Sequence, residues 1–197
     1  MQPLIDNTRL FEQRPEGCAR LAEGQSPQVL FITCSDSRVV PALITGARPG
    51  ELFELRTAGH IVPPYAATTP TGEKATIEYA VQVLGVKHVA VCGHSHCGAV
   101  AAVVRRDDLA AVPAVRDRLV HAADEPKCSG ITDPAVAEAV QNHVLTQLER
   151  LRAYPCVEKR LEAGEVQLHG WYYEVHTGIV REQDAESGTF EMLWGSW

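Results

Sequence analysis

The sequence predicts an α/β fold, with a mostly parallel central sheet flanked by helices and a short antiparallel C-terminal extension. Two observations predict it. Short apolar runs, each typical of a buried parallel strand, alternate along the chain with stretches of helical periodicity. Further short apolar segments then follow one another near the C-terminus. Alternation of strands and helices builds a sheet whose strands run mostly parallel.

The predicted core strands are short apolar runs that cover residues 28–33, 51–56 and 88–92. A helix is predicted between the second and third strands, over Glu73–Leu84. Its apolar residues recur at i, i+3, i+4 and i+7, and Gly85 follows as a residue that commonly ends helices.

A longer helix is predicted from Pro134 to about Arg152, since apolar residues form one stripe along it. After this helix, segments 166–169, 171–176 and 189–193 predict a last core strand and a small antiparallel extension. There is no internal repeat or linker, so these elements are expected to form a single domain.

Bulk properties exclude several classes of function. A net charge of −7 disfavours binding to nucleic acid, which needs a basic patch. No apolar run approaches the roughly 20 residues that span a bilayer, so no membrane association is expected. The first residues lack the basic and apolar regions of a signal peptide, and the cytoplasm is the expected location.

Two loops carry the residue types of a metal site. Cys34 follows the first predicted strand, and the segment Cys92–Gly98 (CGHSHCG) follows the third. Open α/β sheets place their sites at these carboxyl ends. Cys34, His94 and Cys97 offer two thiolates and one imidazole, the composition of a catalytic zinc site with one exchangeable position. A purely structural zinc site, with His96 as fourth ligand, is the alternative.

Asp36 and Arg38 follow Cys34 closely enough to act at the same metal. The Asp36 carboxylate could coordinate zinc or accept a hydrogen bond from a water on it. Arg38 could hold that carboxylate in a bidentate pair and so free the fourth position. Zinc then generates hydroxide at neutral pH, and Asp36 orients it. An ordinary surface ion pair is the alternative.

Residues 34–39 (CSDSRV) and 91–99 (VCGHSHCGA) resemble the two signature segments of β-class carbonic anhydrases. Segments 49–53 (PGELF), 75–81 (ATIEYAV) and 169–173 (HGWYY) are similar to further family segments in the same order. The resemblance implies zinc-dependent, reversible hydration of carbon dioxide to bicarbonate and a proton. It places the zinc ligands on Cys34, His94 and Cys97, and the catalytic pair on Asp36 and Arg38.

The resemblance also implies an assembly and a substrate pocket. Family members are built on dimers, so a homodimer or homotetramer is expected. Residues 1–24 are expected to form an N-terminal helical arm beside a single β-carbonic-anhydrase-like domain at 25–197. Tyr65 and Tyr79 match aromatic residues that line the narrow apolar pocket in plant-like members, and ordinary core packing is the alternative for both. Gly98 opens the helix after the ligand loop, where its N–H could bind bicarbonate.

The chain departs from the family pattern at several positions. Arg48 stands where plant-like members have Gln, so a Gln donor to the substrate is not expected. The Trp–Arg–Tyr trio that binds regulatory bicarbonate in some bacterial members corresponds to Phe31, Arg56 and Tyr173. Without the Trp, an open and active form is expected. Thr57 replaces a more common Asn.

Other functions and residues stay open at this stage. Alternative functions are hydrolysis of carbon disulfide or carbonyl sulfide on the same scaffold, and a non-catalytic zinc-stabilised module. His96 or His60 could transfer protons. The remaining cysteines are expected to be structural thiols: Cys18, Cys92, Cys128 and Cys156.

Overall fold

A computed structural model of the chain describes residues 1–12, 19–66, 68–122 and 133–193. The described residues form a six-stranded sheet in the order β2-β1-β3-β4-β5-β6. Strands β2, β1, β3 and β4 pair in parallel, and β5 and β6 add antiparallel pairs at one edge. The predicted fold class is therefore confirmed. The strands are β1 (Val29–Cys34), β2 (Leu52–Thr57), β3 (His88–His94), β4 (Gln167–Tyr173), β5 (Val180–Gln183) and β6 (Phe190–Met192).

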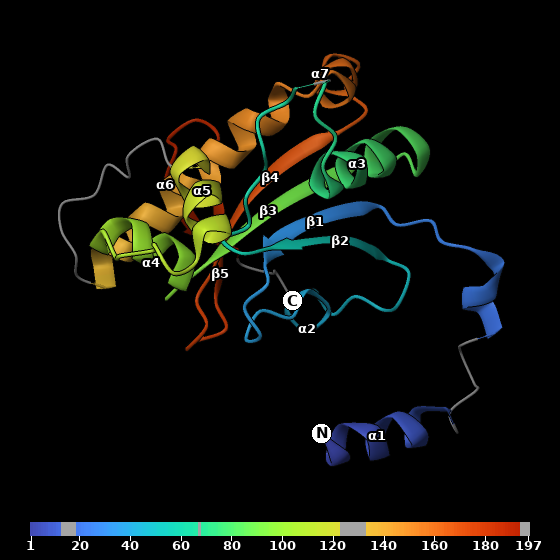
Figure 1. Ribbon diagram of the computed structural model, residues 1–197. Helices are drawn as coiled ribbons and strands as arrows, with labels where there is room; N and C mark the ends of the chain where they lie inside the picture. Colours follow the sequence, from blue (N-terminus) through green and yellow to red (C-terminus); the bar gives the residue numbers. More distant parts are fainter. Residues whose placement is uncertain (13–18, 67, 123–132, 194–197) are drawn as a thin grey trace.

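The helices pack mainly on one face of this sheet, with α6 running along its middle strands β3 and β4 (Figure 1). Helix α1 lies apart from the sheet (Figure 1). The helices are α1 (Gln2–Glu12), α2 (Pro41–Thr45), α3 (Gly72–Glu78), α4 (Gly98–Arg105), α5 (Pro113–Ala122), α6 (Asp133–Arg152) and α7 (Pro155–Glu162), with a 3₁₀ helix at Ala19–Glu23 and a π-helix at Tyr79–Val83. None of the described helices is both long and apolar enough to cross a membrane.

Two glycines bring helix α6 close to the sheet. A Cβ at Gly93 would lie 2.7 Å from side-chain carbons of both Val140 and Val144. In the neighbouring strand, a Cβ at Gly170 would lie 3.0 Å from the Leu148 side chain. The apolar stripe of α6 therefore packs directly on the backbones of β3 and β4, at distances that a larger residue would not permit.

The other face of the sheet carries a smaller apolar cluster around Phe31, Ala90 and Cys92, against which Trp171 packs. Residues of β1 and β3 alternate between the two faces, as the period of a strand requires. Phe31, Ala90 and Trp171 line a groove of about 550 Å³ that is open to solvent in the single chain.

The structure differs from the predicted elements in three places. The helix predicted over 73–84 changes from α to π geometry at Tyr79, where the Leu84 N–H donates to the Tyr79 carbonyl. Segments 166–169 and 171–176 contribute to one strand, β4, because Gly170 belongs to the strand interior rather than to a turn. Strand β5 was not predicted, since its sequence VREQ is mostly polar.

Candidate metal centre

Three potential metal ligands meet where two neighbouring parallel strands end. Cys34 is the last residue of β1, His94 is the last of β3, and Cys97 directly precedes helix α4. All three are buried, and their ligand atoms lie within 4.8 Å of one another. Tetrahedral coordination by two sulfurs and a nitrogen needs separations of about 3.5–3.8 Å, given the usual zinc bond lengths. Small side-chain adjustments would therefore accommodate a zinc ion.

His94 presents an unused nitrogen to this cluster. Its Nδ1 lies 2.9 Å from the backbone carbonyl of Ser95, which requires Nδ1 to be the protonated nitrogen. Its Nε2 is buried and has no hydrogen-bond partner among the described residues. A buried acceptor without a partner is costly, and a metal ion bound by its lone pair would remove that cost. The donor set and the orphaned nitrogen together fit zinc.

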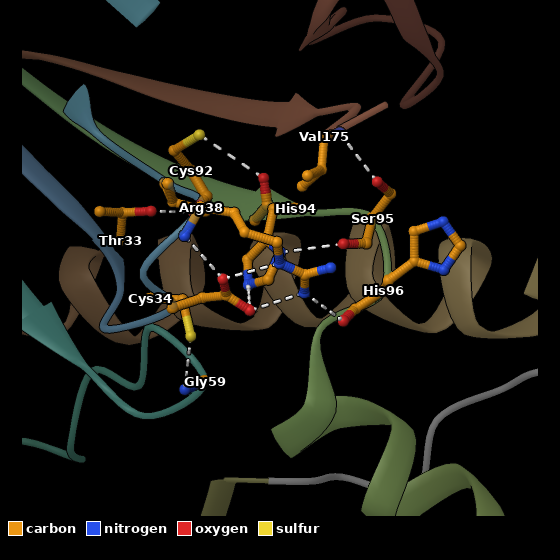
Figure 2. A network of polar contacts seen from close by, with 12 residues as sticks. Thr33, Cys34, Arg38, Gly59, Cys92, His94, Ser95, His96 and Val175 are labelled. Carbon is orange, nitrogen blue, oxygen red and sulfur yellow. Dashed lines mark hydrogen bonds and ion pairs between the residues drawn. The ribbon is translucent and has the colours of Figure 1, made fainter. Parts of the chain in front are cut away.

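The two thiols of the cluster affect each other's ionisation. The neighbouring Cys97 thiol lowers the pKa of Cys34 well below its usual range, and the neighbouring Cys34 raises that of Cys97. The backbone N–H of Gly59 also donates to Cys34 Sγ at 3.4 Å, as Figure 2 shows. Cys92, one strand position before Gly93, is different: burial raises its pKa to about 12, so it stays a neutral thiol.

Asp36 and Arg38 form a bidentate pair beside the cluster. Arg38 Nε donates to Asp36 Oδ1 at 2.9 Å, and Nη2 donates to Oδ2 at 2.7 Å. The backbone N–H of Arg38 also donates to Oδ1 at 2.9 Å. These bonds lower the pKa of Asp36 to about 2, so the carboxylate is charged at neutral pH. Its Oδ2 lies 3.9 Å from His94 Nε2 and thus faces the potential ligands.

Arg56 holds the loop that carries this pair. From strand β2, its guanidinium donates to the backbone carbonyls of Cys34, Asp36 and Val39 at 2.7–3.2 Å. The Arg56 guanidinium therefore binds the backbone of the loop that carries Asp36 and Arg38. Nothing in the sequence pattern predicted this contact, because its acceptors are backbone atoms. Phe31 and Tyr173 lie in the apolar cluster on the other sheet face.

The expected pocket residues lie in different places. Gly98 begins α4 directly beside Cys97, and a Cβ there would meet no atom within 4 Å. Tyr65 and Tyr79 instead line, with Cys156, a groove of about 580 Å³ against α7. Tyr79 packs on Phe53 near the beginning of β2, whereas the potential metal ligands lie at the opposite, carboxyl end of the strands. Within one chain, the two tyrosines therefore do not join the cluster.

The two candidate proton-transfer residues differ in exposure. His96 is exposed, and its ring lies 6.1 Å from that of His176, so its proposed role stays a prediction. His60 is fully buried and packs edge-on against His143, which does not suit exchange of protons with solvent. Cys156 is a buried free thiol, as expected, while Cys18 and Cys128 lie outside the described residues.

Comparisons with known proteins agree with this geometry. A family model described as carbonic anhydrase matches residues 29–180. A carbonic anhydrase of Pseudomonas aeruginosa is 42% identical over 203 residues, which cover 98% of this chain and 92% of that protein. A carbonic anhydrase of Synechococcus elongatus is 47% identical over 178 residues, 87% of this chain. The chain spans only 62% of the length of this cyanobacterial relative.

Solved structures show the same relationship. The structure of the β-carbonic anhydrase CcaA superposes with a TM-score of 0.90 at 37% sequence identity and covers 100% of this chain and 93% of that one. A tetrameric β-carbonic anhydrase from Sordaria macrospora superposes with a TM-score of 0.69 at 30% identity, over 92% of this chain and 94% of that one.

Proposed function

Since this chain belongs to the β-class carbonic anhydrase family, we propose that it catalyses the reversible hydration of carbon dioxide to bicarbonate and a proton. One observation carries the proposal furthest. A charged carboxylate, Asp36, is held by Arg38 beside a buried Cys–His–Cys cluster without occupying the centre of that cluster. A zinc ion bound by Cys34, His94 and Cys97 would therefore keep a fourth position for water.

Bound zinc supplies a Lewis acid that lowers the pKa of a coordinated water to about 7. The chain's own residues supply orientation. Asp36 is ionised and therefore only accepts hydrogen bonds, so its Oδ2 can accept a hydrogen bond from the attacking water and fix the direction of the water's lone pair. Arg38 neutralises the carboxylate and keeps it in place, and its own Nη2 is anchored by the His96 carbonyl at 3.2 Å.

We extend the proposal to the substrate. Gly98 N–H begins a helix beside Cys97 and suits one oxygen of bicarbonate, since helix N-termini favour anions. Tyr65 and Tyr79 are half-buried or exposed in one chain, and they would complete a pocket only when a second subunit places them at its metal centre. The cytoplasmic location stays a prediction.

Two alternative functions would use the residues of this metal centre. Hydrolysis of carbon disulfide or carbonyl sulfide requires the same activated water, and the site residues do not distinguish these substrates. A non-catalytic zinc module predicts a closed four-ligand site. The exposed ring of His96 and the bidentate pair of Asp36 with Arg38 argue against such a closed site.

The proposal predicts rapid hydration by the zinc-loaded protein. In a stopped-flow assay with a pH indicator, we expect carbon dioxide to be the preferred substrate over carbonyl sulfide and carbon disulfide, tested side by side. Protein stripped of zinc by a chelator is the control and should be inactive until zinc is restored. Zinc-loaded, folded protein that hydrated no carbon dioxide would disprove the proposed activity.

The same proposal predicts an oligomer, a homodimer or homotetramer. The uncovered apolar groove beside Phe31 and Trp171, and the outlying helix α1, both suit contact with a second copy. A relative of solved structure is described as tetrameric. Sedimentation at micromolar concentration should show no major monomer. A fully active monomer would contradict the prediction and would require a pocket made within one chain.

A further inference from the structure

Helix α6 and Tyr154, two residues beyond its end, bind a loop beside the metal centre through a row of polar side chains. His143, Gln147, Arg150 and Tyr154 follow one another at i, i+4, i+7 and i+11, so they lie along one side. All four hydrogen-bond to backbone atoms of residues 59–63. His143 Nε2 lies 2.9 Å from the Gly59 carbonyl, and the Tyr154 hydroxyl donates to the Pro63 carbonyl at 2.8 Å.

The hydrogen bonds of Gln147 and Arg150, which lie between His143 and Tyr154, show which nitrogen of His143 carries the proton. The Val62 N–H donates to Gln147 Oε1 at 2.9 Å, and Arg150 Nη1 donates to the Val62 carbonyl at 3.1 Å. Gln147 Nε2 then donates to His143 Nδ1 at 3.4 Å. Nδ1 is therefore an acceptor, which leaves the proton of His143 on Nε2, where the Gly59 carbonyl accepts it. Burial lowers the pKa of His143 to about 3, so the ring stays neutral in this role.

The loop that this row of side chains binds has a strained backbone. Gly59 has φ of +77° and His60 has φ of +46°, two successive left-handed residues of which the second is not glycine. Such a conformation is unfavourable for a non-glycine residue and persists only where neighbouring groups stabilise it. A Cβ at Gly59 would also lie 3.1 Å from that of Ala99 on helix α4.

Gly59 is the point at which this loop meets the metal centre. Its carbonyl accepts from His143, while its N–H donates to Cys34 Sγ at 3.4 Å (Figure 2). The two bonds lie on either side of one α-carbon, so the bond to His143 helps to hold in place the residue whose N–H faces the sulfur. Groups that hydrogen-bond to metal ligands orient them and tune their affinity for the metal.

We propose that His143 is a positioning residue, which holds Gly59 so that its N–H faces the Cys34 thiolate and thereby sets the strength of Cys34 as a metal ligand. The inference rests on the proposed function, because it takes Cys34 to be a ligand. His143 touches neither substrate nor metal, so its effect reaches the metal only through the loop.

The test measures metal affinity and a thiolate signal rather than activity. His143→Phe keeps a ring against His60 but removes the donor. We expect zinc affinity, measured by competition with a chelator, to fall about 10–100-fold. In the Co²⁺-loaded protein, the thiolate-to-cobalt charge-transfer band should move to longer wavelength, because a sulfur without its N–H donor gives up electron density more easily. His143→Gln, which offers an amide N–H, should restore most of the affinity and the band position.

Tyr154→Phe is the matched control, since it removes one buried hydrogen bond from the same row at the end far from Gly59. It should lower the thermal midpoint but keep the zinc affinity and the cobalt band. If His143→Phe folds poorly, Gln147→Leu, which releases His143 Nδ1 and the Val62 N–H, should shift both readouts in the same direction by less.

A folded His143→Phe protein with wild-type zinc affinity and an unshifted band would overturn the inference. So would Tyr154→Phe with the same losses as His143→Phe, because the effect would then be general destabilisation. Cys34→Ser separates this failure from that of the proposed function. If Cys34→Ser also kept wild-type affinity, Cys34 would not be a ligand and the metal site itself would be wrong.

Discussion

Cys97→Ser is expected to lose both the metal and all measurable carbon dioxide hydration. Cys97 is completely buried, and its sulfur is one of only three ligand atoms in the cluster. A serine hydroxyl does not ionise at neutral pH and is a much poorer ligand for zinc than a thiolate. We expect about one zinc per wild-type chain by elemental analysis and close to none in the variant.

Cys92→Ser is the matched control for this substitution. Cys92 is a free, buried cysteine from the same strand as His94, but it does not belong to the cluster. Its serine variant should keep one zinc and most of the rate, although burial of a hydroxyl will cost some stability. Full zinc and full activity in Cys97→Ser would show that the ligand assignment is wrong.

Arg38→Ala is expected to keep zinc and to lose most of the hydration rate. The variant retains the backbone N–H that binds Asp36 Oδ1 but loses both guanidinium bonds, including the one that holds Oδ2. That oxygen already lies 3.9 Å from His94 Nε2. Freed from Arg38, it should take the fourth position on zinc, at roughly 2.0–2.2 Å in a crystal structure of the variant.

Asp36→Asn tests the other half of the pair. The amide is a weak ligand, so water should still reach the metal, but its N–H can face the water where an acceptor is needed. Groups in such roles contribute about 10²–10⁴-fold to rate, and we expect a loss in this range for both variants. Arg152→Ala, which breaks an exposed pair with Glu149, should leave the rate unchanged. A fully active Arg38→Ala protein would reduce the pair to a structural ion pair.

The sequence predicted the parts of the fold and site that depend on local patterns. Strands β1, β2 and β3 were found within two residues of their bounds, because apolar runs mark buried strands whatever their partners. The cluster of Cys34, His94 and Cys97 was predicted because parallel strands bring their carboxyl ends to one edge. The pairing of Asp36 with Arg38 was predictable because the two residues are only two positions apart in the sequence.

Features that depend on tertiary contacts were not predictable. The π-helix at Tyr79–Val83 has an ordinary helical sequence, and the Val81 carbonyl within it accepts from Arg160 of a distant helix. The hydrogen bond from His143 of α6 to Gly59 ends on a backbone carbonyl, and backbone acceptors leave no pattern in a sequence. A polar row at 143, 147, 150 and 154 did exist beside the predicted apolar stripe. It would have indicated a buried partner, but not which one.

The two glycines beneath α6 have a consequence for how this sequence can vary. Gly93 and Gly170 leave room for Val140, Val144 and Leu148 to rest on the sheet. A methyl group at Gly93 would have to be matched by smaller residues at Val140 and Val144, or α6 would move outward and carry its row of polar side chains away from Gly59. Substitutions at the two glycines and at the α6 residues that pack on them should therefore occur together among related chains.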